Sequence, residues 1–132
     1  MGLTIQIKGM KDTYDCGYHT FSMFRRALAT AYNPEMGELY DRLFSFTQTI
    51  SDEDMARYYE LSNPDLDVFL FHSDCDGKLT PKECRGIYNA IKDLEMSMPG
   101  HNYGDMVSYN MLERWKSMFK FCASHRVNMW FR

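Results

Sequence analysis

The segment 72–83 constrains the fold more than any other stretch, because it prescribes a sharp turn followed by a helix start. Gly77 supplies the backbone freedom that a sharp turn requires. Thr80 and Glu83 have the spacing of a capping box, in which each side chain accepts a hydrogen bond from the backbone N–H of the other residue. Pro81 suits the first helical position. A helix is therefore expected to begin at Pro81.

The composition fits one folded domain covering residues 1–132, because 45% of the residues are hydrophobic and 15% are aromatic. The net charge of −3 is spread along the chain without a polybasic block, so nucleic acid is not indicated as a partner. No apolar run approaches the roughly 18 residues of a membrane span, and the N-terminus lacks the pattern of a signal peptide. We therefore expect a cytoplasmic protein whose cysteines are free thiols. These are Cys16, Cys75, Cys84 and Cys122.

Both ends of the sequence show strand-like patterns. Leu3, Ile5 and Ile7 alternate with polar residues, which predicts a half-buried strand. The stretch 127–131 is compatible with a second strand, which would pair with the first. The polar, glycine-flanked stretch 9–17 is expected to be a loop.

Between these ends, apolar residues at steps of three and four predict helices. The stripes are Phe21, Phe24, Leu28 and Tyr32; Met36, Leu39, Leu43 and Phe46; Cys84, Ile87, Ile91, Leu94 and Met98; and Leu112, Trp115, Phe119 and Cys122. A further helix is expected to begin after Ser51 and to lead into Met55, Tyr58 and Tyr59. Asn33-Pro34, Asn63-Pro64 and the acidic run after Ser51 are typical helix starts. Pro99-Gly100 would end the helix after Met98. The fold class predicted is α+β, a mainly helical single domain with one or two short strands near the termini.

Two local features stay open at this point. Residues 65–71 fit either two turns of helix begun by Pro64 or a short buried strand of β-favouring residues. Arg25 and Arg26 lie off the first helical stripe and are expected to be exposed. At the C-terminus, Trp130 and Phe131 would either anchor the chain to the core or mark an interface.

The segment 72–83 resembles the calcium loop of the EF-hand family at most positions. Such loops take oxygen ligands from positions 1, 3, 5, 7 and 12, with glycine at position 6. Asp74 and Asp76 occupy positions 3 and 5, Lys78 offers its carbonyl at position 7, and Glu83 stands at position 12. The resemblance covers about 26 residues, from Asp67 to Lys92, and no second loop of this kind is found.

The departure from that family is His72 at position 1, where the family has aspartate. Imidazole is a poor ligand for Ca²⁺, so the resemblance implies either weak Ca²⁺ binding or a mixed nitrogen and oxygen site for Mn²⁺, Fe²⁺ or Zn²⁺. The candidate metal ligands are His72, Asp74, Asp76, Lys78 (through its carbonyl) and Glu83.

A second resemblance involves the same residues. His-x-Asp-x-Asp-Gly after an apolar strand looks like the first metal motif of the DHH phosphoesterases, which activate water with two metal ions. That resemblance implies a strand over 68–71 and ligands at His72, Asp74 and Asp76. The chain has no Asp-His-His triplet. The whole sequence also resembles small uncharacterised bacterial and phage proteins that carry a His-Ser-Asp-Cys-Asp-Gly segment, which implies no activity.

The same segment can also be explained without an ion, as a turn leading into a capped helix. Cys75 invites comparison with a catalytic nucleophile, although a Cys–His pair is defined in space rather than in sequence. His101 would reach the segment only if the fold brought it there. Three hypotheses therefore remain: a non-enzymatic, calcium-like metal-binding module that interacts with a protein partner, a metal-dependent hydrolase, and an adaptor without metal.

Overall fold

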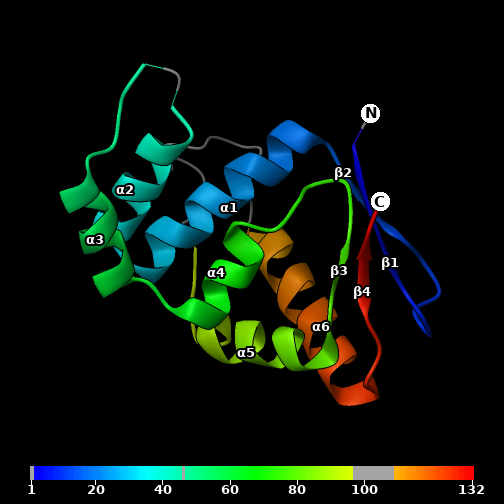
Figure 1. Cartoon of the computed structure of the whole chain (residues 1–132). Coiled ribbons are helices and arrows are strands. Elements are labelled where there is room, and N and C mark those ends of the chain that lie inside the picture. The colour runs from blue at the N-terminus through cyan, green and yellow to red at the C-terminus, as the bar shows by residue number, and fades with distance from the viewer. Residues whose placement is uncertain (1, 46, 97–108) are drawn as a thin grey trace.

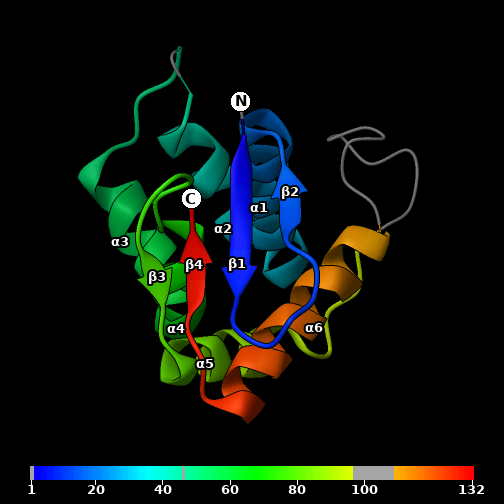
Figure 2. The ribbon, with the colours of Figure 1, turned by 90° about the vertical axis from the view of Figure 1, so that its right-hand side faces the viewer.

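The structure is a computed structural model that describes residues 2–45, 47–96 and 109–132. A four-stranded antiparallel sheet forms one side of the molecule, and the described helices all lie on the same side of it (Figures 1 and 2). The prediction of a mainly helical α+β fold is confirmed.

The two terminal strands form the middle of the sheet. Its order is β2-β1-β4-β3, with β1 at Leu3–Ile7 and β4 at Met129–Phe131 paired through Ile5 and Phe131. The expected pairing of the two ends of the chain is confirmed. Strand β2, at Tyr14–Cys16, corrects the prediction of a loop throughout 9–17, and β3 at Lys78–Leu79 forms the other edge.

The helices begin at the signals present in the sequence. Their bounds are α1 Tyr18–Tyr32, α2 Pro34–Leu43, α3 Asp52–Leu61, α4 Pro64–Leu70, α5 Pro81–Ile91 and α6 Tyr109–His125. The side chains of Asn33, Ser51 and Asn63 each accept a backbone N–H of the helix that follows, as N-caps do. Phe46, which belongs to the predicted stripe of α2, lies outside the described residues.

The ambiguous stretch before residue 72 is helical. Asn63 caps α4, Pro64 occupies its first turn, and Leu66, Phe69 and Leu70 point into the core. The capping signal and the helical spacing outweigh the β-favouring residue types, because burial of one helix face supplies most of the stability. The strand that the phosphoesterase resemblance requires at 68–71 is therefore replaced by a helix as far as Leu70.

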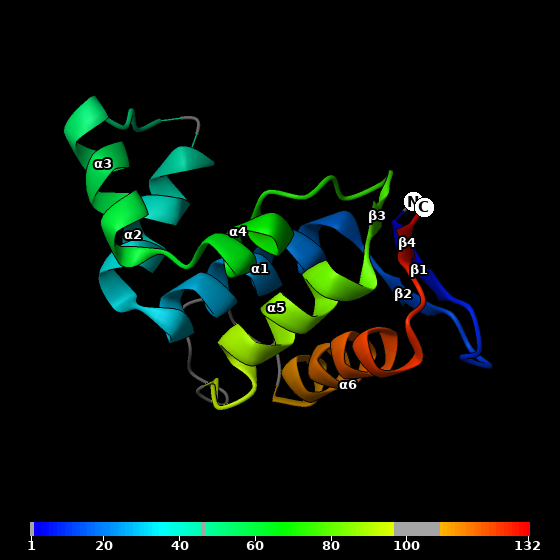
Figure 3. The ribbon, with the colours of Figure 1, turned by 60° about the horizontal axis from the view of Figure 1, so that its bottom comes forward.

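Helix α5 ends earlier than predicted. It stops at Ile91 instead of continuing through Leu94 to Met98. The ammonium group of Lys116, on α6, donates to the carbonyl oxygens of Lys92 (3.2 Å) and Leu94 (2.6 Å). These carbonyls are thus satisfied from the neighbouring helix, which lies alongside α5 (Figure 3). Residues 97–108, with Pro99, Gly100 and His101, lie outside the described residues.

The core lies between the sheet and the helices. Trp115 is fully buried at its centre, stacked on Phe21 and Phe24, as the predicted stripes of α1 and α6 require. All four cysteines are free thiols. Among the described residues, no helix is long and apolar enough to cross a membrane.

The buried Tyr40 should make the free energy of unfolding fall at alkaline pH. Its hydroxyl donates to the carbonyl oxygen of Leu70 (2.7 Å), and burial raises its pKa to about 12 from the usual 10.0. The hydroxyl of Tyr40 loses its proton at a lower pH in the unfolded chain than in the folded one. The contribution of Tyr40 to the free energy of unfolding is therefore fully present below pH 10 and is lost as the pH rises towards 12. The loss expected from Tyr40 is about 3 kcal/mol.

We expect Tyr40→Phe to lower stability by about 1 kcal/mol at neutral pH, through the lost hydrogen bond. Urea unfolding between pH 8 and pH 12 should show a shallower alkaline decline for Tyr40→Phe than for the wild type. Tyr59→Phe, at an exposed tyrosine of the next helix, is the control and should keep the full decline. Equal slopes for Tyr40→Phe and the wild type would contradict the prediction.

Candidate functional site

The candidate site is the 72–83 loop, which connects α4 to α5 and carries β3 (Figure 1). Gly77 has φ +85°, a left-handed conformation that suits glycine, so the predicted sharp turn is confirmed. The carbonyl of Gly77 accepts the N–H of Phe131 (2.9 Å), and Lys78 pairs with Trp130. The C-terminal strand therefore fixes the middle of the loop, a contribution that the sequence did not reveal.

Two carbonyl oxygens face the imidazole of His72, one at each ring nitrogen. Nδ1 lies 2.9 Å from the oxygen of Ser73, and Nε2 lies 3.1 Å from the oxygen of Lys78. The ring also packs on Phe131, with centroids 4.1 Å apart, and stands 3.5 Å from where a β-carbon of Gly77 would be. Positions 1 and 7 of the loop thus meet across its interior.

A neutral imidazole cannot satisfy both of these carbonyls. It carries one N–H donor and one lone pair, so one ring nitrogen would face a carbonyl oxygen lone pair to lone pair. That contact is favourable only when positive charge lies between the two atoms. The geometry around His72 thus leaves one ring nitrogen at which a bound cation would make the contact with the carbonyl oxygen favourable.

The distances also fit two neighbouring ligands of one ion. Ligands held about 2.1 Å from an ion lie about 3.0 Å apart in octahedral and about 3.4 Å apart in tetrahedral geometry. The separation of 3.1 Å between His72 Nε2 and the Lys78 oxygen falls between these values. A metal-bound histidine commonly donates its other N–H to a backbone carbonyl, and the Ser73 oxygen is in position to accept it.

The acidic side chains are not gathered at that point. Within the described residues, no group of three or more His, Cys, Asp or Glu side chains is arranged to hold a metal ion. Glu83 accepts the N–H of Thr80 through Oε1 (2.9 Å), so the predicted capping box is formed. Asp76 is exposed and Asp74 is half-buried. Binding an ion through these carboxylates would therefore require them to turn inward.

Arg25 secures the start of the loop, which the sequence did not predict. Its Nη1 donates to the carbonyl of His72 (2.6 Å) and, more weakly, to that of Phe69 (3.4 Å). The side chain is half-buried, as is that of Arg26, which corrects the prediction that both arginines are exposed. Burial lowers the pKa of Arg25, while Tyr40 and Asp74 act in the opposite direction. A cation at the C-terminal end of α4 also complements the helix dipole.

Among the described residues, the other reactive side chains do not join the loop ligands. Cys75 is exposed and lies beside the Ser73 hydroxyl (3.8 Å). Cys84 and Cys122 are buried in contact between α5 and α6, and this contact together with burial raises the pKa of Cys84. His125 contacts Phe121 on its own helix.

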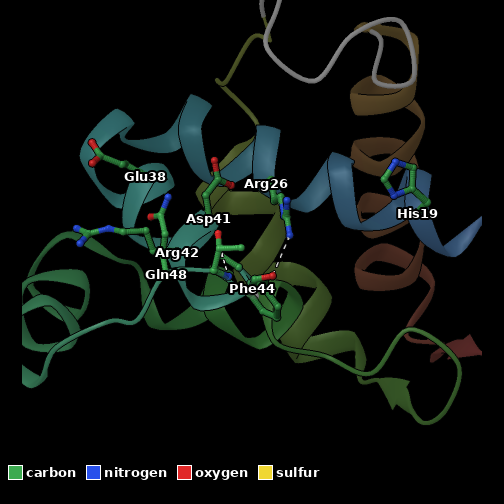
Figure 4. A pocket seen from close by; sticks show the side chains of 9 residues that line it. His19, Arg26, Glu38, Asp41, Arg42, Phe44 and Gln48 are labelled. Atoms are coloured by element: carbon green, nitrogen blue, oxygen red, sulfur yellow. Dashed lines mark hydrogen bonds between the residues drawn. The ribbon is translucent and has the colours of Figure 1, made fainter.

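A hollow in the described part of the chain lies elsewhere, beside α1, the end of α2 and the residues after it. Its volume is about 750 Å³, and Figure 4 shows His19 and Glu38 at opposite ends with Arg26 donating to the Phe44 carbonyl between them. The lining contains both arginines and carboxylates and none of the predicted ligands. It therefore has no single charge preference and adds nothing to the loop.

Comparisons with models of known protein families, with curated proteins and with solved structures find no match.

Proposed function

We propose that the 72–83 loop binds one divalent cation and that the protein is a non-enzymatic binding module. The single observation that supports this proposal is that both ring nitrogens of His72 face carbonyl oxygens, with Nε2 3.1 Å from the Lys78 oxygen. In the proposed bound state Nδ1–H donates to the Ser73 carbonyl and the ion lies between Nε2 and the Lys78 oxygen. Asp74, Asp76 and Glu83 would turn towards the ion.

The proposed ligand set favours ions that accept both nitrogen and oxygen. Imidazole suits Mn²⁺ and Zn²⁺ far better than the hard cation Ca²⁺. Arg25, held next to the loop by the His72 carbonyl, adds positive charge near the ion. We therefore expect the order of affinity to place Zn²⁺ and Mn²⁺ above Ca²⁺ and Mg²⁺, and Ca²⁺ binding to be weak.

Melting curves of EDTA-treated protein, recorded with each ion in turn, test the proposal. A ligand that binds only the folded state stabilises it by about 2.7 kcal/mol at a concentration 100 times its Kd. For a chain of this size that corresponds to a rise in Tm of about 10 °C. Mn²⁺ and Zn²⁺ should raise Tm, and Asp76→Asn should lose most of the rise.

Asp12→Asn is the matched control, because this exposed aspartate lies in the turn between β1 and β2. It should keep the full response to the ions. The proposal fails if none of the four ions changes Tm, or if Asp76→Asn responds as strongly as the control.

A second candidate is an adaptor whose loop closes without metal. One observation favours it, namely that Glu83 Oε1 already accepts the Thr80 N–H in the capping box. The same melting curves separate the two candidates. If the protein is an adaptor without metal, no ion should change the Tm of the wild type or of any loop variant.

A further inference from the structure

The outer face of the sheet carries an exposed tryptophan between two cations. Trp130 on β4 is 36% exposed, whereas its neighbours Met129 and Phe131 are buried. The ammonium of Lys78 lies 5.1 Å from the centre of the indole ring, and the guanidinium of Arg132 lies 5.2 Å from it. Lys78 comes from β3, so the β3–β4 pairing brings together charges that are far apart in the sequence.

Polar groups complete this face. Gln6 is exposed and stands opposite Trp130 in the register of β1 and β4. Thr4 donates a hydrogen bond to Asp15 (2.7 Å), so the acidic group on this face already has a partner. Figure 2 shows the described helices behind the sheet, and none of them covers its outer face. We call Gln6, Lys78, Trp130 and Arg132 the tryptophan face.

We propose that the tryptophan face binds single-stranded nucleic acid. Proteins that bind single strands combine aromatic rings, on which bases stack, with cations that contact the phosphates. Trp130 would stack on a base, Lys78 and Arg132 would turn from the ring to the neighbouring phosphates, and the Gln6 amide would hydrogen-bond a base edge. Binding here does not depend on a cation in the 72–83 loop.

The chemistry favours a nucleic acid over an acidic peptide. Peptide carboxylates would pair with Lys78 and Arg132 but would leave the indole ring without a planar partner. A single-stranded nucleic acid offers both a base for the ring and phosphates for the cations. A duplex hides its bases inside the stack, so a flat face with one aromatic ring suits a single strand. The overall net charge of −3 predicts modest affinity, and two phosphate contacts predict that the affinity falls moderately as the salt concentration rises.

The test uses the full chain and a fluorescently labelled oligothymidylate, with binding followed by anisotropy. We expect saturable binding at low salt, with a log–log salt slope of about −1.4 for two phosphate contacts. Quenching of tryptophan emission should accompany it, since Trp130 is exposed and Trp115 is buried.

The variants separate stacking from charge. Trp130→Ala should weaken binding at least about 10-fold, whereas Trp130→Phe, which keeps a ring, should retain most of the affinity. The double variant Lys78→Gln and Arg132→Gln should flatten the salt slope. The control variant Lys92→Gln with Lys120→Gln removes two exposed cations elsewhere on the surface. It should change neither the affinity nor the salt slope. Circular dichroism establishes that each variant is folded.

Three results would overturn the proposal. The first is absence of saturable binding at low salt. The second is equal affinity for Trp130→Ala and the wild type. The third is equally tight binding of polyglutamate of matched length, which would assign the face to an acidic protein segment instead.

Discussion

Phe69→Ala should destabilise the protein by about 3–5 kcal/mol and lower Tm by about 10–20 °C. Phe69 is the aromatic side chain that α4 buries near its C-terminal end, and it is fully inaccessible to solvent. Its ring centroid lies 5.1 Å from that of Trp115 and 5.1 Å from that of Phe119. Removing it leaves a cavity among the buried aromatic rings of the core, so both the transfer energy and the packing energy are lost.

Phe71→Ala is the matched control for this prediction, because Phe71 lies only two residues away and is 44% exposed. We expect that variant to lose only about 1 kcal/mol, since less apolar surface is removed from contact. Urea unfolding of both variants measures the difference directly. Similar losses of stability for the two variants would contradict the conclusion that the buried Phe69 stabilises the fold far more than the exposed Phe71 does.

Arg25→Met should destabilise the protein by about 2–3 kcal/mol at neutral pH. Methionine keeps an unbranched apolar side chain but removes the charged hydrogen bonds to the carbonyls of His72 and Phe69. Hydrogen bonds from charged groups contribute about 1.5–3 kcal/mol. The guanidinium also lies 4.4 Å from the centre of the Phe21 ring, which adds about 0.5–1 kcal/mol.

Arg26→Met provides the comparison, since Arg26 donates only a long bond of 3.4 Å to the Phe44 carbonyl. Its loss should stay below about 1 kcal/mol. Chemical unfolding gives both values. If Arg25→Met were as stable as the wild type, the apolar contacts of methionine would offset the lost charged hydrogen bonds, as happens at some buried ion sites. That result would contradict the claim that the hydrogen bonds of Arg25 hold the start of the loop.

The helix starts could be predicted because they depend on neighbouring residues. Thr80 and Glu83 form their capping box within one turn, and Asn63 with Pro64 begins α4 in the same local way. The buried stripes followed from helical spacing. The confirmed parts of the fold are therefore those in which residues close in sequence determine the geometry.

The features that were missed depend on residues distant in sequence. Strand β2 exists because Tyr14 to Cys16 pair with β1, although their sequence is short and polar in character. Arg25 was expected at the surface, since nothing near it in the chain indicates the carbonyl oxygens of α4. The early end of α5 depends on Lys116 from α6. Such contacts form only once the chain has folded.

The candidate site was predicted only in part. The sequence identified the loop, its glycine turn and its five candidate ligands. It did not indicate that the His72 ring lies between two carbonyl oxygens, because that arrangement needs Gly77 below the ring and Phe131 beside it. The central claim of our proposal is that the acidic side chains turn towards an ion bound at this loop.

The most direct test is the nitrogen NMR spectrum of the histidine side chains, recorded with and without one equivalent of Zn²⁺. Metal binding at the loop predicts that His72 Nε2 moves to the position of a metal-bound nitrogen, while Nδ1 stays protonated on the Ser73 carbonyl. The signals of His19 and His125 serve as internal references and should stay unchanged. Unchanged His72 signals at saturating Zn²⁺ would contradict the account and leave a loop closed by hydrogen bonds alone.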